Sequence, residues 1–290
     1  MKGEIFVEKK LNSPQSLPIE KLHPFEGHPF KVLDNEDMAN LVESIQSQGV
    51  LNPLTVRPLK NGDYEVISGH RRLHACRLAG METVPALIYE LDRDQAAIIL
   101  VDSNLHREHI LPSEKAFAYK LKAEALQHQG MRSDLTSVQV APKLSTEMIA
   151  EAAGTSKDTV KRFIRLTYLE AELLNMVDEG KIALTPAVEL SYLKPEEQQH
   201  LLETMSGDDC TPSLSQAVNM KKMSQLGVLS TELIDHIMGE PKANQKEKIS
   251  FRMDDIRKFF PRDYDAVKIQ ETILKLLKEY QRQQKNELSR

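Results

Sequence analysis

Two short stretches of alternating apolar and polar residues flank an Asn-Gly pair early in the chain. Residues 54–57 and 64–67 show the alternation of half-buried strands, and Asn61-Gly62 between them is a strong signal for a tight turn. This pattern predicts a β-hairpin. Ser68-Gly69 then predicts a second tight turn, and residues 70–79 have the character of a helix that stops at a glycine.

The remaining segments of the first hundred residues mix strands and helices without a regular βαβ rhythm. Residues 17–19 and 84–89 predict strands, and residues 94–105 predict a helix. Another helix is indicated by Met38, Val42 and Ile45, which recur at helical spacing behind a predicted N-cap at Asp34. We therefore expect an α+β fold in this part of the chain.

From residue 111 onward the pattern is helical. Pro112 suits a first helical turn, Gly130 predicts the end of that helix, and residues 131–143 predict a loop. Residues 145–168 then contain two helical stretches separated by a turn at Gly154, with Ser156 as the predicted N-cap of the second. This is the helix-turn-helix pattern.

The second helix of this pair carries four basic residues and one acidic residue on its exposed face. Early residues of such a helix reach base edges in the major groove, whereas later Lys and Arg residues contact phosphates. The alternative is a plain helical hairpin with a solvated basic face. We predict DNA contacts from Ser156, Lys157, Thr159, Lys161, Arg162 and Arg165.

The C-terminal part has a different pattern. Residues 206–247 are mostly polar and include Pro212 and Pro241, which predicts a linker, within which residues 226–238 could form a short helix. Residues 248–253 predict a strand. Apolar residues then follow helical spacing over residues 264–284. The stripe is shorter than the three or four heptads of a coiled coil, so either its own domain or a partner helix could cover it.

Composition excludes several classes of protein. The chain has 38 Lys and Arg against 43 Asp and Glu, a net charge of −5, so a uniformly basic coat is excluded but a local basic patch is not. Cys76 and Cys210 lie far apart without metal-binding spacing, which indicates a reducing compartment and no disulfide framework. No segment has the roughly 18 apolar residues of a membrane span. We expect a cytoplasmic protein without membrane contact.

The turn at Gly69 carries the candidate chemistry. A strand, a glycine turn and a helix start place free backbone N–H groups at one point, which suits an anion. Arg71 and Arg72 add two guanidinium forks, whose geometry matches phosphate. The alternative is two solvated arginines on a surface helix.

Three segments occur in a fixed order at residues 44–57, 69–75 and 103–108. They resemble the SIxxxGVLxPLxVR segment, the GERRxRA phosphate loop and the ENxxRE segment of the ParB/RepB family of partition proteins. The resemblance, from about residue 17 to about residue 193, implies a ParB/sulfiredoxin-like domain that binds CTP and Mg²⁺. It implies nucleotide contacts from Gly69, His70, Arg71, Arg72, Asn104 and Arg107, and a metal contact from Asn104.

The chain departs from the family pattern at His70 and Ser103, which stand where the family has glutamates, and at His74, which replaces a later arginine. A serine oxygen is a weaker Mg²⁺ ligand than a carboxylate, and imidazole suits softer metals. Asp102 could replace the second glutamate, but on a helix it points about 100° away. We expect that CTP binding is retained and that hydrolysis is slow or absent.

The predicted organisation has five parts. A flexible arm at 1–16 precedes a ParB-like nucleotide-binding domain at 17–110 and a helix-turn-helix domain at 111–205. A linker at 206–247 and a C-terminal region at 248–290 follow. The resemblance implies dimerisation through this last region, hence a homodimer. It also names a ParA-type ATPase as a candidate partner of the arm.

These inferences converge on a sequence-specific double-stranded-DNA-binding partition protein, a dimeric clamp switched by CTP, for a plasmid, mobile element or chromosome. A transcription or replication regulator of a mobile element would use the same modules. A phosphotransferase on this scaffold would need an acid/base group near the arginines, for which His70 and Asp102 are the candidates. Sulfiredoxin chemistry is disfavoured because the phosphate loop contains no cysteine.

Overall fold

The computed structural model describes residues 13–105, 107, 109–133, 141–208, 210–240, 253–261 and 263–288. The chain divides into two compact units, with the boundary between Glu240 and Pro241. Residues 1–12 of the predicted arm lie outside the described residues. The last two residues of that predicted arm, Gln15 and Ser16, belong to the first strand instead.

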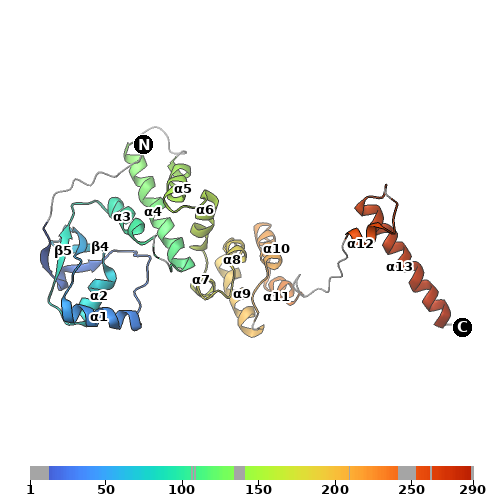
Figure 1. Ribbon diagram of the computed structural model, residues 1–290, viewed down its shortest axis with the longest axis horizontal. Helices are drawn as coiled ribbons and strands as arrows, with labels where there is room; N and C mark the ends of the chain where they lie inside the picture. The colour runs from blue at the N-terminus through green and yellow to red at the C-terminus, as the bar shows by residue number, and fades with distance from the viewer. Residues whose placement is uncertain are drawn as a thin grey trace. The chain divides into compact units, whose positions relative to one another are not determined.

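The first unit begins with a mixed five-stranded sheet (Figure 1). Its strands lie in the order β1-β5-β3-β4-β2, and the short 3-10 helix η1 separates β1 from β2. β3 and β4 pair antiparallel across the Asn61-Gly62 turn, which confirms the predicted hairpin. The bounds are β1 (Gln15–Pro18), η1 (Ile19–Lys21), β2 (Leu22–Pro24), β3 (Leu54–Pro58), β4 (Tyr64–Ser68) and β5 (Thr83–Ile88).

Neighbouring residues of β4 face opposite sides of this sheet. Val66 belongs to a buried cluster with residues of α1 (Glu36–Gln48) and α2 (His70–Leu78). Ile67 belongs to another cluster with residues of α3 (Arg93–Asn104) and α4 (Pro112–Ser133). The two faces therefore have different helical layers, and the α+β prediction is confirmed.

Two predicted helix boundaries are corrected. The N-cap of α1 is Asn35, whose side chain accepts a hydrogen bond from the Met38 N–H, while Asp34 lies 2.6 Å from the His74 imidazole. The helix α4 continues through Gly130 to Ser133. A glycine inside a helix costs only about 1 kcal/mol relative to alanine, so it need not end one.

The predicted helix-turn-helix pair is α5 (Ala141–Ala152) and α6 (Lys157–Leu166). Residues 134–140 of the loop expected before it lie outside the described residues, and α5 begins four residues earlier than predicted. Both helices pack against α4 through one buried cluster, and the Tyr119 and Phe163 rings meet edge to face at 5.9 Å. α6 thereby keeps its polar side exposed.

Five further helices share a second buried cluster: α7 (Ala171–Asp178), α8 (Leu184–Leu190), α9 (Pro195–Asp208), α10 (Leu214–Gln225) and α11 (Thr231–Gly239). The linker predicted over 206–247 is therefore wrong for α10, whereas α11 overlaps the short helix expected over 226–238. The Gln216 side chain donates hydrogen bonds to the Ile237 and Met238 carbonyls at 2.8 and 3.3 Å. Polar groups thus join these two helices, which explains why their composition resembled that of a linker.

The second unit contains α12 (Met253–Arg257) and α13 (Ala266–Leu288). The predicted strand at 248–253 is wrong at Met253, which begins α12, and its other residues lie outside the described part. α13 confirms the predicted C-terminal helix. Ile269 is buried, but Leu274, Leu277 and Tyr280 are more than half exposed.

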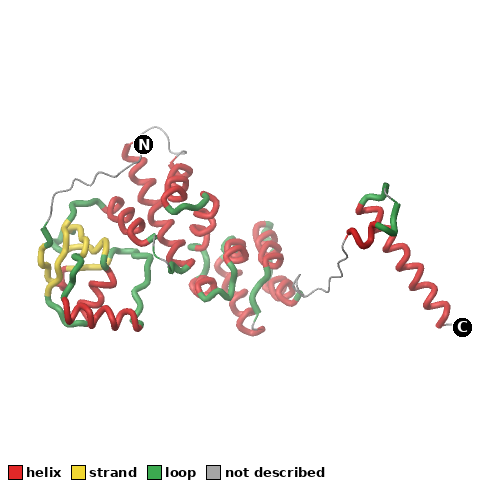
Figure 2. The backbone as a smooth tube through the Cα atoms, viewed as in Figure 1, coloured by secondary structure: helices red, strands yellow, loops and turns green. Residues whose placement is uncertain are grey.

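Figure 2 shows that, among the residues that the structure describes, the strands lie in the N-terminal part of the chain and the later part is made of helices and connecting loops. No helix among the described residues is both long enough and apolar enough to cross a membrane.

Candidate functional site

The turn between β4 and α2 is built on Gly69. Its φ is +104°, and a Cβ at this position would lie 3.0 Å from the Leu54 side chain. Any other residue would therefore be both strained and crowded. The turn brings the chain directly from the sheet into α2, whose first turn contains no acidic residue. The free N–H groups of this helix start suit an anionic ligand, as predicted.

The two arginines of α2 have different environments. Arg72 donates hydrogen bonds to the backbone carbonyls of Asn52 and Pro53, the latter at 2.9 Å, and burial lowers the pKa of its guanidinium. It therefore anchors the segment that leads into β3. Arg71 forms no hydrogen bond or ion pair with any other residue that the structure describes. Its guanidinium is the less constrained of the two.

His70 is held as a neutral support of the turn. Its Nε2 accepts the Phe25 N–H at 3.3 Å, and its ring also bonds to the backbone of Val66. The ring lies 3.7 Å, centroid to centroid, from that of His28. Burial, and then the neighbouring His28, lower the pKa of His70 to about 3. A direct contact between His70 and a nucleotide stays a prediction.

Arg107 lies close enough to this stack to affect its titration. Burial is the main cause of the lowered pKa of His28, and the positive charge of Arg107 lowers it further. Arg107 is exposed, and its backbone N–H donates to the Asn104 carbonyl at 3.1 Å. The fold thus brings the charge of Arg107 near His28, whose ring lies against that of His70 at the start of α2, 37 residues earlier in the sequence.

The end of α3 holds the residues predicted for the metal. Asn104 donates through Nδ2 to the Leu100 carbonyl at 2.8 Å, and Ser103 donates to the same carbonyl at 3.0 Å. Asp102 pairs with Lys122 of α4, whose side chain is 5% exposed. Asp102 therefore forms an ion pair that joins α3 to α4. Within the described ranges no group of three His, Cys, Asp or Glu residues could hold a metal.

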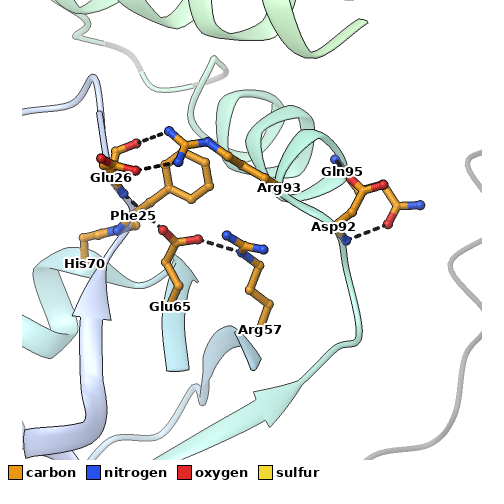
Figure 3. Close-up of polar contacts among 8 residues, drawn as sticks. All are labelled: Phe25, Glu26, Arg57, Glu65, His70, Asp92, Arg93 and Gln95. Atoms are coloured by element: carbon orange, nitrogen blue, oxygen red, sulfur yellow. Dashed lines mark hydrogen bonds and ion pairs between the residues drawn. The ribbon is translucent and has the colours of Figure 1, made fainter. Parts of the chain in front are cut away.

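Sequence reasoning missed a buried ion pair on the α3 face of the sheet (Figure 3). Arg57 and Glu65 are partners in the register of β3 and β4, and Arg57 Nε lies 2.6 Å from Glu65 Oε2. The other carboxylate oxygen accepts the Glu26 N–H at 3.2 Å. Opposite charges at facing positions of the predicted hairpin were the signal that could have revealed the pair.

Figure 3 also shows how this pair continues toward α3. Arg93, the first residue of α3, lies 2.5 Å from the Glu26 carboxylate and 5.6 Å from the centre of the Phe25 ring. Phe25 is the residue whose N–H bonds to His70. One segment therefore contacts the ion pair, α3 and the turn that carries the two arginines.

A second polar network joins the nucleotide-binding candidate to the helical part. Glu114 of α4 accepts the Lys31 N–H at 2.7 Å, and Asp178 of α7 accepts the Ser113 N–H at 2.8 Å. The Lys31 ammonium lies 3.3 Å from Asp178. Lys31 follows the segment that contains His28, and the His28 ring lies against that of His70. These contacts therefore connect the Gly69 turn to α7.

The start of α6 is set by its cap. Ser156 accepts the Thr159 N–H at 3.1 Å, and the two hydroxyl oxygens lie 2.9 Å apart, which confirms the predicted N-cap. Lys157 forms an exposed pair with Glu147 at 3.4 Å. Lys161 is exposed and has no polar partner among the described residues. These side chains are accessible to a polyanion.

The two arginines of α6 bind within the protein. Arg162 donates to the Thr185 hydroxyl at 2.6 Å. Arg165 donates to the Ser191 hydroxyl at 3.0 Å, and its guanidinium lies over both the Tyr168 and the Tyr192 rings. From the sequence, every basic residue of this face was predicted to contact DNA. In the structure, Arg165 has several partners within the protein, whereas Lys161 has no polar partner among the described residues.

Two family models match separate regions of this chain. The ParB N-terminal domain model matches residues 6–105, and the ParB HTH domain model matches residues 122–211. A probable chromosome 1-partitioning protein ParB of Deinococcus radiodurans is 36% identical over 174 residues, which cover 60% of this chain and 54% of that protein. The chromosome-partitioning protein Spo0J of Thermus thermophilus is 32% identical over 228 residues, covering 76% of this chain and 78% of that protein.

Two crystal structures of C-terminally truncated ParB from Caulobacter crescentus are also similar. The one complexed to the centromeric parS site has a TM-score of 0.41 and 24% identity, and covers 72% of this chain and 98% of that one. The one complexed with CTP-gamma-S has a TM-score of 0.31 and 28% identity, and covers 61% of this chain and 91% of that one.

Proposed function

This chain belongs to the ParB family of partition proteins, and from this membership we propose that it is a sequence-specific DNA-binding partition protein whose state is switched by CTP. The observation that carries the proposal is the exposed basic face of α6, which is held by its cap and by its packing against α4. A capped helix behind a glycine turn, with its apolar side buried and its cationic side exposed, fits the major groove of DNA.

The first turn of α6 would supply the base contacts. Lys157 and Thr159 stand at the N-terminal end, where a recognition helix comes closest to base edges, and Ser156 holds that end in place. Lys161 and Arg162 lie further along and would contact phosphates. Lys161 can do so without breaking a polar contact to another described residue, whereas Arg162 would exchange its bond to Thr185.

CTP would bind at the start of α2. Gly69 brings the free N–H groups to one point, Arg71 supplies an unengaged fork, and Arg72 and Arg107 add positive charge beside them. Together these groups match a triphosphate. His70 would act from behind the turn, since its ring nitrogens already bond to the backbone.

Mg²⁺ fits this site only as a partner of the nucleotide. The ion commonly takes one or two protein oxygens together with substrate phosphates and water. Asn104 donates through its nitrogen, so its amide oxygen would be the ligand. Ser103 offers a neutral oxygen, and Asp102 is paired with Lys122. The residues present therefore favour CTP binding over rapid hydrolysis.

The remaining features concern assembly. We propose a homodimer that closes around DNA as a clamp, with the exposed apolar side chains of α13 as the dimerisation surface. Segregation of a plasmid, mobile element or chromosome, within the cytoplasm, would then require a ParA-type ATPase as partner. A transcription or replication regulator would use the same contacts. A phosphotransferase is disfavoured, because His70 is held neutral inside the fold and Asp102 forms an ion pair.

The deciding experiment is selection of bound duplexes from a random DNA library, with and without CTP. We expect enrichment of one site and a CTP-dependent change in retention on DNA. Enrichment of no site by the full chain would refute sequence-specific binding. Enrichment that is identical with and without CTP, together with no heat of CTP binding in calorimetry, would refute the nucleotide switch.

A further inference from the structure

We propose that Arg165 is a positioning residue, which fixes the orientation of α6 against α8 and thereby sets the sequence specificity of DNA binding without touching DNA. This inference rests on the proposed DNA-binding function. It differs from the expectation from sequence, in which Arg165 was one of six direct contacts. Its basis is the set of contacts that the guanidinium makes with two aromatic rings and with the end of α8.

Two aromatic rings contact the Arg165 guanidinium. Its Cζ lies 4.4 Å from the centre of the Tyr168 ring and 4.0 Å from that of Tyr192. Tyr168 follows the C-cap of α6, and Tyr192 follows the C-cap of α8. A guanidinium is attracted to a ring face electrostatically and can also stack on it, and an ammonium group cannot reproduce the stacking.

The edge of the same guanidinium binds the end of α8. Nε donates to the Ser191 hydroxyl at 3.0 Å, and Nη2 donates to the Ser191 carbonyl at 2.5 Å. Ser191 is the C-cap of α8, is 1% exposed, and donates a hydrogen bond from its own hydroxyl to the Val188 carbonyl at 2.7 Å. A cation at a helix C-terminus also complements the helix dipole. Arg165 therefore binds the buried end of a neighbouring helix, through a geometry specific to its fork.

The stack extends to a lysine at each end. Lys221 of α10 lies 4.0 Å from the Tyr192 ring centre and pairs with Glu189 at 2.9 Å, and Lys120 of α4 lies 5.6 Å from that of Tyr168. Cations and rings thus alternate across four helices. We call this set the cation–aromatic ladder; its members are Lys120, Tyr168, Arg165, Tyr192 and Lys221.

The ladder acts on the C-terminal half of α6, whereas the proposed base contacts lie in its first turn. α6 is a short helix that moves as one rigid body, so a change of tilt or rotation at one end reorients the whole helix. Loss of the ladder would therefore reorient Lys157 and Thr159 relative to the base edges. Phosphate attraction depends mainly on charge and tolerates such a displacement, but hydrogen bonds to bases do not.

The test compares Arg165→Lys with Lys161→Ala in the full chain. Affinity is measured over a salt series for a duplex carrying the selected site and for a scrambled duplex of equal length. We expect Arg165→Lys to reduce the preference for the site by about tenfold, comparable to one mismatched base pair, with an unchanged salt dependence. Lys161→Ala should lower affinity for both duplexes alike and reduce the salt slope by about one.

Three results would overturn the inference. A salt slope reduced by about one in Arg165→Ala, with site preference intact, would make Arg165 a phosphate contact. A lower melting temperature with unchanged preference and slope would make its role purely structural. Parental behaviour of Arg165→Lys in every respect would also refute it. If the parent itself prefers no site, the proposed function fails, and the inference fails with it.

Tyr192 supplies matched variants that leave the charge of α6 unchanged. Tyr192→Phe keeps the ring and should bind like the parent, whereas Tyr192→Leu removes the ring and should reproduce the loss of site preference. This pair also serves if Arg165→Lys does not fold. Equal preference in Tyr192→Leu and Tyr192→Phe would show that the ladder has no part in recognition.

Discussion

The start of α2 and the exposed face of α6 are two cationic regions that divide their basic residues in the same way. At α2, Arg72 is bonded to backbone carbonyls while Arg71 has no polar partner among the described residues. At α6, Arg165 is bonded to α8 while Lys161 is similarly unengaged within the described part. In each region one cationic side chain binds other parts of the protein and another remains accessible to a polyanion, although both side chains carry the same formal charge.

The two regions differ in what their engaged arginine holds. Arg72 binds the backbone just before β3, so it connects the start of α2 to a segment of the same domain. Arg165 connects α6, the proposed recognition helix, to the end of α8 through the Tyr192 ring and through hydrogen bonds to Ser191. A backbone anchor sets local shape, whereas a contact between helices sets relative orientation. We therefore expect mutation of Arg72 to lower CTP affinity and stability together, and mutation of Arg165 to change the sequence specificity of DNA binding.

The largest effect should come from a fully engaged arginine with no ligand role. Arg57→Ala leaves the Glu65 carboxylate buried without its partner, and removal of one member of a buried pair costs about 3–5 kcal/mol. Denaturant unfolding should show this loss. The double variant Arg57→Met with Glu65→Leu should recover most of it. Equal stability of Arg57→Ala and the parent would contradict the importance of burial.

The next prediction separates the two arginines of α2. Arg71→Ala and Arg72→Ala should each weaken CTP binding, by about 1.5–3 kcal/mol for a charged hydrogen bond. Only Arg72→Ala should also lower the free energy of unfolding, by about 1–3 kcal/mol, because the carbonyls of Asn52 and Pro53 lose their donor. Calorimetry with CTP and denaturant unfolding without it measure the two effects. Equal stability of both variants would break the distinction between engaged and unengaged cations.

A smaller effect concerns pH. The folded-state pKa of His70 is about 3, below its ordinary value of 6.5, so between these values the unfolded chain binds a proton that the folded chain does not. Stability from this group is therefore full above pH 6.5 and falls as the pH decreases toward the folded pKa. We expect a loss of about 2 kcal/mol between neutral pH and about pH 5. His70→Asn should flatten this dependence in urea titrations. An unchanged slope in that variant would show that other groups cause it.

The smallest expected change is at Ser103, which lies beside the proposed cation ligand. Ser103→Glu should raise CTP turnover with little change in affinity, because it adds a carboxylate for Mg²⁺ while the three arginines remain. Asp102→Ala should leave turnover unchanged and lower stability, since Lys122 would lose its partner. Steady-state phosphate release with operator DNA present measures both variants. Rapid release by the parent that is lost in Asp102→Ala would move the cation site to Asp102.

The sequence alone determined the features that depend on local pattern. Alternation of apolar and polar residues, together with the Asn61-Gly62 turn, predicted the hairpin. Gly69 predicted the tight turn before α2, and Ser156 predicted the N-cap of α6. Each of these features depends on residues within a few positions of one another. The ordered motifs supplied the family. Short-range steric and hydrogen-bonding preferences are encoded directly in residue type, so these predictions needed no tertiary information.

Only the tertiary structure decided which charged groups remain for a ligand. Arg165 meets Ser191, 26 residues away, and Asp102 meets Lys122 of the next helix. The same limit applies to α10 and α11, whose apolar residues are buried in one cluster with residues of α7, α8 and α9. Partners of this kind depend on how separate elements pack. Composition records that a residue is basic or polar, but packing determines whether its hydrogen-bonding groups are already satisfied.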